Sequence, residues 1–432
     1  MSFDRMQRSK FSQQLSFWRW WVNQHFWSVV FVSATSIALL GSAATLCLPV
    51  RFPASPFQFE QDGSTIQYEP PFQGKVHFNN IPGEPVFESL FQQRIKESIS
   101  TISIAMYSFS LKSIHDELEM AQGEGKDTCV VVDGRRNPDL AETFLLEEQT
   151  KYHVVSPVTT DFSRMHHKFM VIDEETDRAQ AFIGSCNLTR QQVGHDPGAF
   201  IEIHDPTIAG ELAEEIGRIR RGTRGRAKLQ DPSYRPLACT VRRGDETAEL
   251  WFSPGFGTNS FKQRLIELIK SAESTIDIAI WKFADLELAK LLVAKAKSGV
   301  RVRLIIDDHL GIGGMDVFGC LTSNSVIQLK AGLQMKAANQ KDEASGNKSI
   351  IPRRPFIHHH TVIVDDRVIA FGSSNWSYAG FYMNDEANLI TDITWITQPF
   401  VQVFELLDRN SKPMTDEMIR VLRDSVLLEQ YR

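Results

Sequence analysis

The chain has 432 residues, roughly two to three times the length of a typical single domain, so one large α/β unit or two fused units are expected. Apolar residues make up 42% of the chain and charged residues 23%, which excludes a collagen, a coiled coil and a wholly disordered protein. The net charge of -6 gives no global attraction to nucleic acid or anionic lipid, so such a partner requires a local basic patch.

Residues 26–50 contain no charged side chain and form a run long enough to cross a bilayer as a helix. Basic residues precede the run, and only Arg51 follows it closely, so the positive-inside rule places residues 1–25 in the cytoplasm and the remainder outside. We therefore expect a single-pass membrane protein whose catalytic part is extracytoplasmic. Secretion is the alternative, because Ser42 and Ala44 fit the cleavage site of a signal peptide.

Residues 84–228 and residues 258–432 show one pattern twice, in a constant register that aligns Phe87 with Phe261. In each copy an apolar helical stripe, a buried strand, a second helix and a strand ending in Asp follow in that order. This order predicts a mostly parallel sheet covered by helices. We expect an α/β fold of two α/β/α sandwich units packed around a shared site after the transmembrane helix. Residues 229–257 are expected to link the units, and the proline-rich residues 51–83 to form an extended linker before them.

Each copy carries a histidine motif followed by a Gly-Ser-x-Asn segment. The first copy reads Met-His-His-Lys from residue 165 and Gly-Ser-Cys-Asn from residue 184, and the second reads Ile-His-His-His from residue 357 and Gly-Ser-Ser-Asn from residue 372. Strand alternation places the first histidine and the residue two positions after it on one face, and a tight turn after the strand brings the Gly-Ser-x-Asn end beside the histidine. The polar side chains collected in this way are His166, Lys168, Ser185 and Asn187 in the first copy and His358, His360, Ser373 and Asn375 in the second.

Two imidazoles, a cation and several amides suit the cleavage of a phosphodiester. One neutral imidazole can attack phosphorus while the other gives its proton to the leaving oxygen, and Lys and Asn donors stabilise the charge on the non-bridging oxygens. This chemistry needs no metal and no other cofactor. Both motifs lie in one chain, so a monomer is sufficient to form the site.

The paired H-x-K-x4-D and G-S-x-N motifs resemble the phospholipase D superfamily, over residues 84 to about 205 and 258 to about 392. The resemblance implies a phosphohistidine intermediate, with His166 as the nucleophile and His358 as the acid. The remaining family positions are, by the same match, phosphate-binding Lys168, Asn187 and Asn375 and site-supporting Asp173 and Asp365.

The second motif departs from this family because His360 stands where the family has Lys. An imidazole with an ordinary pKa near 6.5 is mostly neutral at pH 7, so the site loses part of a positive charge. We expect a protonated His360 to hold phosphate together with Lys168, so that activity falls as pH rises through its pKa. The three consecutive histidines also suggest a metal site, which alternation disfavours because it sends His359 to the opposite face. Glu386 is a candidate for the family's acidic residue, whereas the first copy offers only Glu202 in another register.

Six basic residues at positions 218–228 could bind a phosphate backbone or an anionic membrane, although a solvated linker is the expected interpretation. The predicted function is a membrane-anchored phosphodiesterase of phospholipase D type that hydrolyses phospholipid head groups. An endonuclease of the same superfamily, with nucleic acid as its partner, is the first alternative. A catalytically weakened binding protein at the membrane, motivated by His360, is the second.

Overall fold

The computed structural model describes residues 71–79, 87–137, 152–155, 163–194, 196–307, 311–333, 355–420 and 423–424, all of which belong to one compact unit spanning residues 67–432. The expected anchor at residues 26–50 and most of the expected linker at 51–83 lie outside these residues. In the described part of the chain, no helix is both long enough and apolar enough to cross a membrane. The anchor therefore stays a prediction.

The first half of each repeat follows the predicted register at every element. Helix α2 (Phe87–Glu97), strand β2 (Thr101–Met106), helix α3 (Lys112–Gly123) and strand β3 (Asp127–Asp133) form it in the first repeat. Helix α7 (Phe261–Ser271), strand β10 (Thr275–Ile280), helix α8 (Leu286–Lys297) and strand β11 (Arg301–Ile306) form it in the second, and the constant register aligns each starting residue with that of its counterpart. The internal repeat is confirmed for this half.

The second half of each repeat carries the histidine motif and two hairpin strands. The first repeat has β4 (Tyr152–Val155), β5 (Lys168–Ile172), β6 (Gln180–Gly184), α5 (Arg190–Gly194) and β7 (Ala199–Ile203). The second has α9 (Met315–Thr322), β12 (Ile327–Leu333), β13 (Thr361–Val364), β14 (Val368–Gly372), α10 (Tyr378–Tyr382) and β15 (Glu386–Thr391). From β6 and β14 onward a second constant register holds, which aligns Gly184 with Gly372 and also aligns the starts of α5 and α10.

Each repeat builds one sheet, and the two strand orders correspond. The first sheet has the order β1-β7-β6-β5-β2-β3-β4 and the second the order β16-β12-β11-β10-β13-β14-β15-β9-β8. Among these described strands, only β2–β3–β4 and β10–β11–β12 run parallel, and the remaining pairs are antiparallel. The expectation of mostly parallel sheets is therefore wrong. A tight turn after each histidine motif joins β5 to β6 and β13 to β14 as antiparallel hairpins, and β7 and β15 then pair antiparallel with β6 and β14.

Two segments expected to be linkers contribute strands. Within residues 229–257, β8 (Leu237–Arg243) and β9 (Glu246–Ser253) form a hairpin that pairs with β15. Within residues 51–83, β1 (Gly74–Phe78) pairs with β7 and so takes the position in the first sheet that β9 takes in the second. Each of these additions covers a sheet edge that would otherwise be open.

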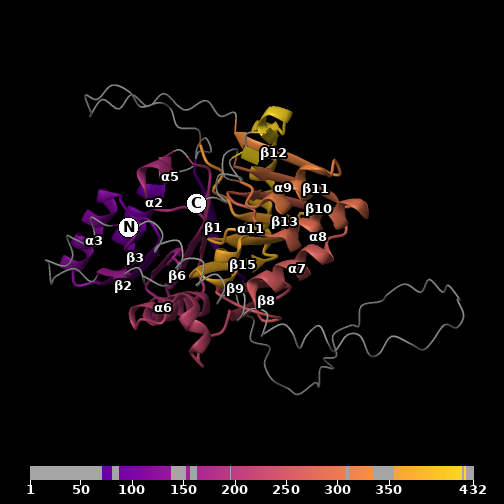
Figure 1. Cartoon of the computed structure of the whole chain (residues 1–432). Helices are drawn as coiled ribbons and strands as arrows, with labels where there is room; N and C mark the ends of the chain where they lie inside the picture. The colour runs from indigo at the N-terminus through magenta and orange to yellow at the C-terminus, as the bar shows by residue number, and fades with distance from the viewer. Residues whose placement is uncertain are drawn as a thin grey trace, which may run out of the picture. The chain divides into compact units, whose positions relative to one another are not determined.

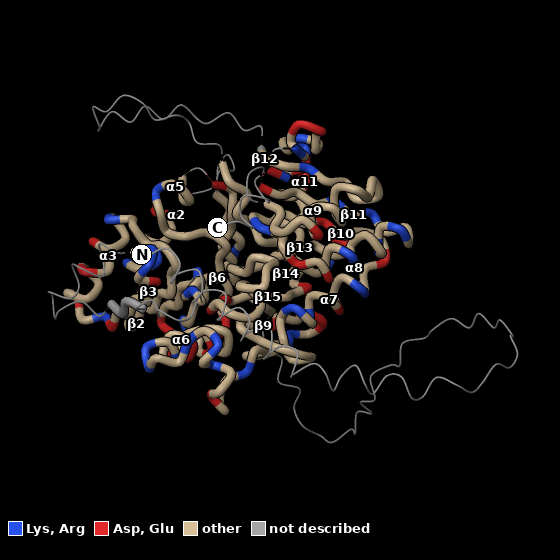
Figure 2. The backbone as a smooth tube through the Cα atoms, viewed as in Figure 1, with Lys and Arg blue, Asp and Glu red and all other residues tan. Residues whose placement is uncertain are grey.

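Helices cover the outer faces of the sheets, and a shared core fills the space between their inner faces (Figure 1). One outer core joins the first sheet to α2 and α3, and another joins the second sheet to α7, α8 and α9. The shared core also includes apolar residues of α6 (Pro206–Arg220) and α11 (Thr394–Asn410), the latter leading into β16 (Ser411–Pro413). Charged residues gather on helices such as α6 and α8, and the central strands carry few of them (Figure 2). The structure is thus a mixed α/β fold with two sheets.

Candidate active site

The two histidine motifs meet where strands β5 and β13 begin. His166 lies two residues before β5 and His358 three residues before β13, and both are almost fully buried. Each imidazole is hydrogen-bonded to a side chain of the opposite repeat: His166 Nδ1 lies 2.8 Å from Glu386 Oε2, and His358 Nε2 lies 3.0 Å from Gln192 Nε2. The structure thereby brings the paired motifs of one chain into a single composite site.

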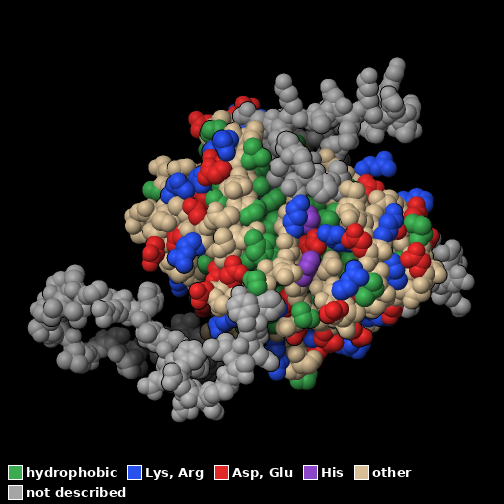
Figure 3. Space-filling model, turned by 180° about the vertical axis from the view of Figure 1, so that it is seen from behind, with side chains coloured by type: hydrophobic (Ala, Val, Ile, Leu, Met, Phe, Trp, Pro, Cys, Tyr) green, Lys and Arg blue, Asp and Glu red, His purple; other side chains and the backbone are tan. Residues whose placement is uncertain are grey.

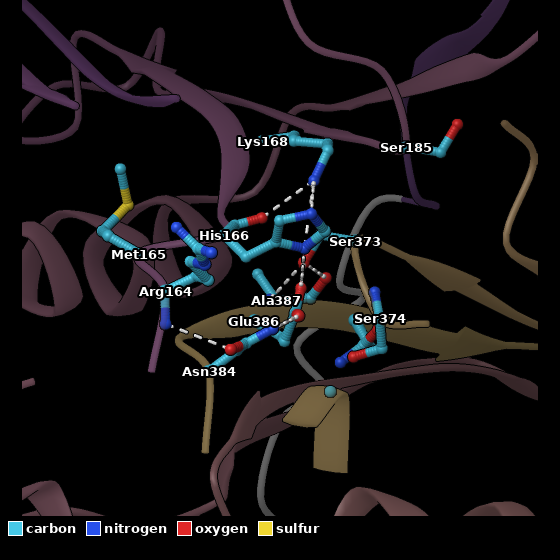
Figure 4. Close-up of polar contacts among 12 residues, drawn as sticks. Arg164, Met165, His166, Lys168, Ser185, Ser373, Ser374, Asn384, Glu386 and Ala387 are labelled. Atoms are coloured by element: carbon cyan, nitrogen blue, oxygen red, sulfur yellow. Dashed lines mark hydrogen bonds and ion pairs between the residues drawn. The ribbon is translucent and has the colours of Figure 1, made fainter. Parts of the chain in front are cut away.

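Glu386 orients the imidazole of His166 (Figure 4). Its buried carboxylate also accepts hydrogen bonds from Ser373 Oγ at 2.6 Å and Asn384 Nδ2 at 3.0 Å, which fix its position at the start of β15. Because the carboxylate faces Nδ1, Nε2 is the ring nitrogen left to attack phosphorus. Glu386 thus takes the role for which the sequence offered it only as a candidate.

Lys168 supplies the cation beside His166. Its Nζ lies 3.2 Å from both ring nitrogens and donates to the backbone carbonyl oxygen of His166 at 3.0 Å. Burial lowers the pKa of Lys168 to about 8 and raises the pKa of Glu386 to about 7, the latter opposed by the lysine charge. Burial and the lysine charge hold the pKa of His166 well below its usual value. His166 is therefore a neutral imidazole at pH 7, as a nucleophile must be.

Two carbonyl oxygens determine the tautomer of His358. Its Nδ1 lies 3.1 Å from the backbone oxygen of Ser185, which can only accept, so Nδ1 carries the hydrogen. Gln192 Oε1 accepts from the backbone N–H of Asn187 at 2.5 Å, so the amide Nε2 of Gln192 is the donor toward His358 Nε2. Burial, helped by the Lys168 charge, lowers the pKa of His358 to about 3. The free protein thus holds His358 neutral, with its Nε2 occupied by an amide.

Of the two histidines, His166 alone has a carboxylate partner among the described residues, and a closely packed glycine explains the difference. In the register that aligns Gly184 with Gly372, the counterpart of Glu386 in the first repeat is Gly198. A Cβ at Gly198 would lie 2.0 Å from Cys186 Sγ, so no larger residue fits there without rearrangement. Glu202, the residue that the first repeat offered for this role, lies farther along β7 and pairs with His77, Arg94 and His204.

His360 does not supply the expected cation. It is buried, its ring lies 5.0 Å from that of His358, and neither of its ring nitrogens has a hydrogen-bond partner in the described part of the chain. Burial, with the neighbouring His358 and Lys168, holds the pKa of His360 well below its usual value. The expectation of a protonated His360 is therefore wrong, because a second cation would have to be desolvated beside Lys168. His359 points instead toward Phe78, with ring centroids 6.1 Å apart, as alternation predicts.

The four polar side chains of the Gly-Ser-x-Asn segments lie at the site but mostly contact the protein. Ser373 and Ser185 are fully buried, the first donating to Glu386 and the second accepting from the backbone N–H of Ala199 at 3.2 Å. Their expected role in binding substrate is therefore replaced by one in holding the site. Asn187 donates to Gln192 Oε1 at 3.0 Å, whereas Asn375 Oδ1 has no partner among the described residues.

Asp173 and Asp365 lie at the far ends of the motif strands. Lys168 and Asp173 are five residues apart along β5, so at the rise of an extended strand Asp173 lies roughly 16 Å from Lys168. Asp173 accepts hydrogen bonds from the backbone N–H groups of residues 99–101, and Asp365 accepts the equivalent set from residues 273–275. Both therefore fix the turn between the first helix and strand of their repeat, and they support the site through the fold.

A pocket of about 300 Å³ opens onto both motif histidines, His166 and His358. Trp281 stacks on His358 at 5.4 Å between ring centroids, and Tyr107, its counterpart in the first repeat, meets His166 edge-on at 4.5 Å. Arg136 is exposed at the pocket, and its Nε donates to the Tyr107 hydroxyl at 3.1 Å. The pocket is lined by Tyr107, Ser108, Arg136, His166, Asn187, Thr189, Gln191, Gln192, Asp196, Trp281, Phe356 and His358.

The basic run at 218–228 is partly buried behind the site. Lys228, in a short 3-10 helix (Gly225–Gln230), is fully buried between Glu215 and Asp385, and its Nζ lies 2.7 Å from Asp385 Oδ1. Glu215 also contacts Arg218 at 2.6 Å and His167 Nε2 at 3.0 Å. Burial alone would raise the pKa of Glu215, but Lys228 and His167 lower it to about 2. The backbone oxygen of Asp385 accepts from His166 N–H at 2.9 Å, so this network supports the position of His166.

Gln192 and Lys228 are site residues that the sequence patterns do not reveal. Neither belongs to a repeated motif, since the residue equivalent to Gln192 is Gly380 and Lys228 lies between the repeats. The signal for Glu386 was its place shortly after the Gly-Ser-x-Asn segment, at the start of the next strand.

Comparison with known proteins defines the class to which this fold and paired site belong. A family model described as "Cardiolipin synthase, PLD-like domain" matches residues 91–220 and 265–407, together more than half of the chain. The chain therefore belongs to the phospholipase D superfamily.

Individual relatives match different parts of the chain. Mitochondrial cardiolipin hydrolase of Xenopus laevis is 30% identical over 159 residues, which cover 37% of this chain and 66% of the relative, slightly under two thirds of its length. Cardiolipin synthase B of Salmonella typhimurium is 24% identical over 332 residues, which cover 71% of this chain and 72% of the relative. The crystal structure of phosphatidylserine synthase from Haemophilus influenzae gives a TM-score of 0.59 at 15% identity, covering 83% of this chain and 95% of that one. The likeness to phosphatidylserine synthase shows a similar fold alone.

Proposed function

We propose that the chain is a phosphodiesterase of phospholipase D type that removes head groups from phospholipids through a phosphohistidine on His166. The observation that carries the proposal is the arrangement of His166, oriented by Glu386, opposite His358 in one pocket. Nε2 of His166 forms a bond to phosphorus while the bond from phosphorus to the head-group oxygen breaks. That oxygen takes a proton from Nε2 of His358 and leaves as an alcohol. In the second step a hydroxyl acceptor, water in hydrolysis, gives its proton to His358 and releases His166.

The protons that this reaction needs are present at neutral pH. The reactive complex requires one proton on His358 and one on Lys168. In the free protein below about pH 7 the same two protons reside on Glu386 and Lys168, because the pKa of His358 is about 3. Groups coupled in this way titrate as a set. The negative charge of a bound phosphodiester favours protonation of the adjacent His358, so substrate binding moves the proton to the place where it is used.

Charge and relatives favour a lipid over a nucleic acid. Arg218 and Lys228 are buried in ion pairs, so these two residues of the basic run are unavailable to a phosphate backbone. On the face seen in Figure 3, Lys and Arg alternate with Asp and Glu among the described residues instead of forming a basic band. Two relatives named as a cardiolipin hydrolase and a cardiolipin synthase support the same substrate class.

The test is an assay of the purified chain, with EDTA present, against mixed phospholipids and against single-stranded and double-stranded DNA. We expect a phosphatidyl product and a free alcohol from lipid, abolished by His166→Ala. DNA cleavage that depends on His166, without lipid turnover, would identify an endonuclease instead. Binding to lipid vesicles without turnover of any substrate would support the weakened binding protein.

The location of the enzyme is a separate proposal that rests on the charge pattern around residues 26–50. We propose a single-pass anchor with the catalytic part outside the cytoplasm. The protein should then remain in membranes after alkaline carbonate washing, and a carboxyl-terminal reporter should behave as extracytoplasmic. A soluble mature form beginning near residue 45 would show a cleaved signal peptide.

A further inference from the structure

Gln192 holds the ring nitrogen through which His358 must act. Its side-chain amide is locked in one orientation, because Oε1 accepts from both the backbone N–H and Nδ2 of Asn187, at 2.5 and 3.0 Å. The amide Nε2 then donates to His358 Nε2 at 3.0 Å. The backbone oxygen of Gln192 accepts from Asn79 Nδ2 at 2.5 Å, which ties this part of α5 to the loop after β1. These polar contacts together position one residue of the pocket wall.

The second repeat has no such residue beside His166. The counterpart of Gln192 is Gly380, where a Cβ would lie 2.2 Å from the backbone oxygen of Asn375. The backbone of α10 therefore excludes a glutamine at this position. As a result the attacking nitrogen of His166 meets no amide cap of this kind among the described residues, whereas the corresponding nitrogen of His358 is capped.

This difference matters between the two chemical steps. After the head-group alcohol has left, His358 is neutral, and its Nε2 lone pair is the base that would deprotonate any water beside the phosphohistidine. The Gln192 amide occupies that lone pair with an N–H that it does not give up. Water that arrives from bulk solution must displace the amide. An alcohol held in the pocket by its own binding contacts displaces the amide more readily, because its effective concentration there is high.

We propose that Gln192 is a positioning residue that caps Nε2 of His358 and so directs the phosphatidyl group of the phosphohistidine to an alcohol acceptor rather than to water. The inference rests on the proposed function and names its acceptor class. In the favoured step the acceptor oxygen forms a bond to phosphorus, the phosphorus–Nε2 bond to His166 breaks, and the acceptor proton passes to Nε2 of His358. The product is a new phosphodiester, and no oxidant or reductant is needed.

The first test measures how the phosphatidyl group is partitioned. The full chain is given phosphatidylglycerol in mixed micelles with a fixed concentration of 1-butanol, and phosphatidylbutanol is compared with phosphatidic acid. Loss of one hydrogen bond corresponds to about a fivefold change, so we expect Gln192→Ala to lower the ratio of transfer to hydrolysis about fivefold. Arg190→Ala, an exposed position of the same helix outside the pocket wall, is the matched control and should keep the wild-type ratio. A wild-type ratio in Gln192→Ala would overturn the inference.

A second test does not depend on turnover. The titratable groups around His358 are Lys168, His166 and His359, with His360 beside it and Asp196 across the pocket, and Gln192→Ala changes none of them. Removal of a donor to the neutral imidazole should raise the protonation midpoint of His358, followed by NMR of 15N-histidine-labelled protein. An unchanged midpoint would contradict the cap even in an inactive protein. Absence of lipid turnover in the wild type, with the midpoint raised in the variant, would refute the proposed function and leave the cap in place.

Discussion

The two repeats share their fold element by element, yet they contribute different chemistry to the site. The first supplies the proposed nucleophile His166, the cation Lys168 beside it and the amide of Gln192, and the second supplies His358 and the carboxylate of Glu386. Glycines mark the missing counterparts, because Gly198 stands opposite Glu386 and Gly380 opposite Gln192. The two histidines of this duplicated fold therefore have different surroundings, because each repeat lacks the side chain that the other repeat supplies.

What the repeats keep in common is structural. Asp173 and Asp365 make the same hydrogen bonds to the same turn, and the aromatic residues Tyr107 and Trp281 flank the two histidines in equivalent positions. The comparison teaches that, apart from the two histidines, these symmetric positions maintain the fold, whereas the asymmetric positions Glu386 and Gln192 distinguish the surroundings of the histidines. The variants below test that division.

The largest expected effect separates the two histidines. His166→Ala should lower turnover on the order of 10⁶-fold, because no other group can form the covalent intermediate. His358→Ala should lower it by about 10²- to 10⁴-fold, the usual range for a lost general acid. Steady-state kinetics on phospholipid, with circular dichroism to show that both variants fold, measures the difference. Equal losses would show that the repeats are not specialised as the contacts indicate.

Glu386→Gln should lower turnover at pH 7 by roughly 10²- to 10⁴-fold and also change the pH profile. In the wild type we expect kcat/KM to fall as pH rises from about 7 to about 8, since the proton on Glu386 is lost first and that on Lys168 second. The variant has no carboxyl proton to transfer, so its optimum should move to more acidic pH, toward the low pKa of His358. A pH profile superimposable on that of the wild type would show that Glu386 does not hold a proton used in the reaction.

Lys228→Met tests the join between the repeats. The substitution leaves Asp385 buried without its cation and Glu215 with Arg218 and His167 alone, which should lower the free energy of unfolding by about 3–5 kcal/mol. Arg221→Met is the control, because the pair of Arg221 with Glu214 is about half exposed and should be worth about 0–1 kcal/mol. Urea denaturation of both variants gives the comparison, and equal stabilities would mean that the buried network does not hold the repeats together.

The smallest effect is expected at His360, where the second motif departs from the first. His360→Asn keeps a residue that tolerates the observed φ of 45° and should leave the pH profile unchanged, because His360 is already neutral. His360→Lys should move the alkaline limb to lower pH, since a second buried ammonium disfavours the charge on Lys168. Loss of pH dependence in His360→Asn would show that His360 of the wild type is protonated in the reaction, as the sequence suggested.

Much of the fold was predictable because local patterns determine it. The register that aligns the two copies follows from hydrophobic periodicity, and it predicts the paired helices and strands correctly. The hairpin of β8 and β9 turns at Gly244 and Asp245, a local signal from which it could have been predicted. Strand β1 was missed because it depends on pairing with β7, which lies far away in the sequence. Strand pairing of this kind leaves little signal in a single segment.

The site was predictable only where the two copies agree. His166, Lys168 and His358 follow from the motif, whereas the protonation state of His360 depends on burial beside Lys168, which no spacing reveals. Asp173 and Asp365 were expected to support the site because they belong to the motif, but only the structure shows that they do so by fixing a turn at the far end of the strand. Gln192 reaches His358 from the other repeat, and only the packing of the sheets brings the two together.

The specialisation of the two histidines is tested most directly by trapping the intermediate. The full chain, its His166→Ala variant and its His358→Ala variant are quenched in base during turnover of phospholipid labelled at phosphorus, and the labelled peptide is identified. The account predicts acid-labile, base-stable label on His166 in the wild type, its absence from His166→Ala, and its accumulation in His358→Ala, where transfer to the acceptor lacks a base. Label on His358 that persists in His166→Ala would contradict the assignment and exchange the roles of the two repeats.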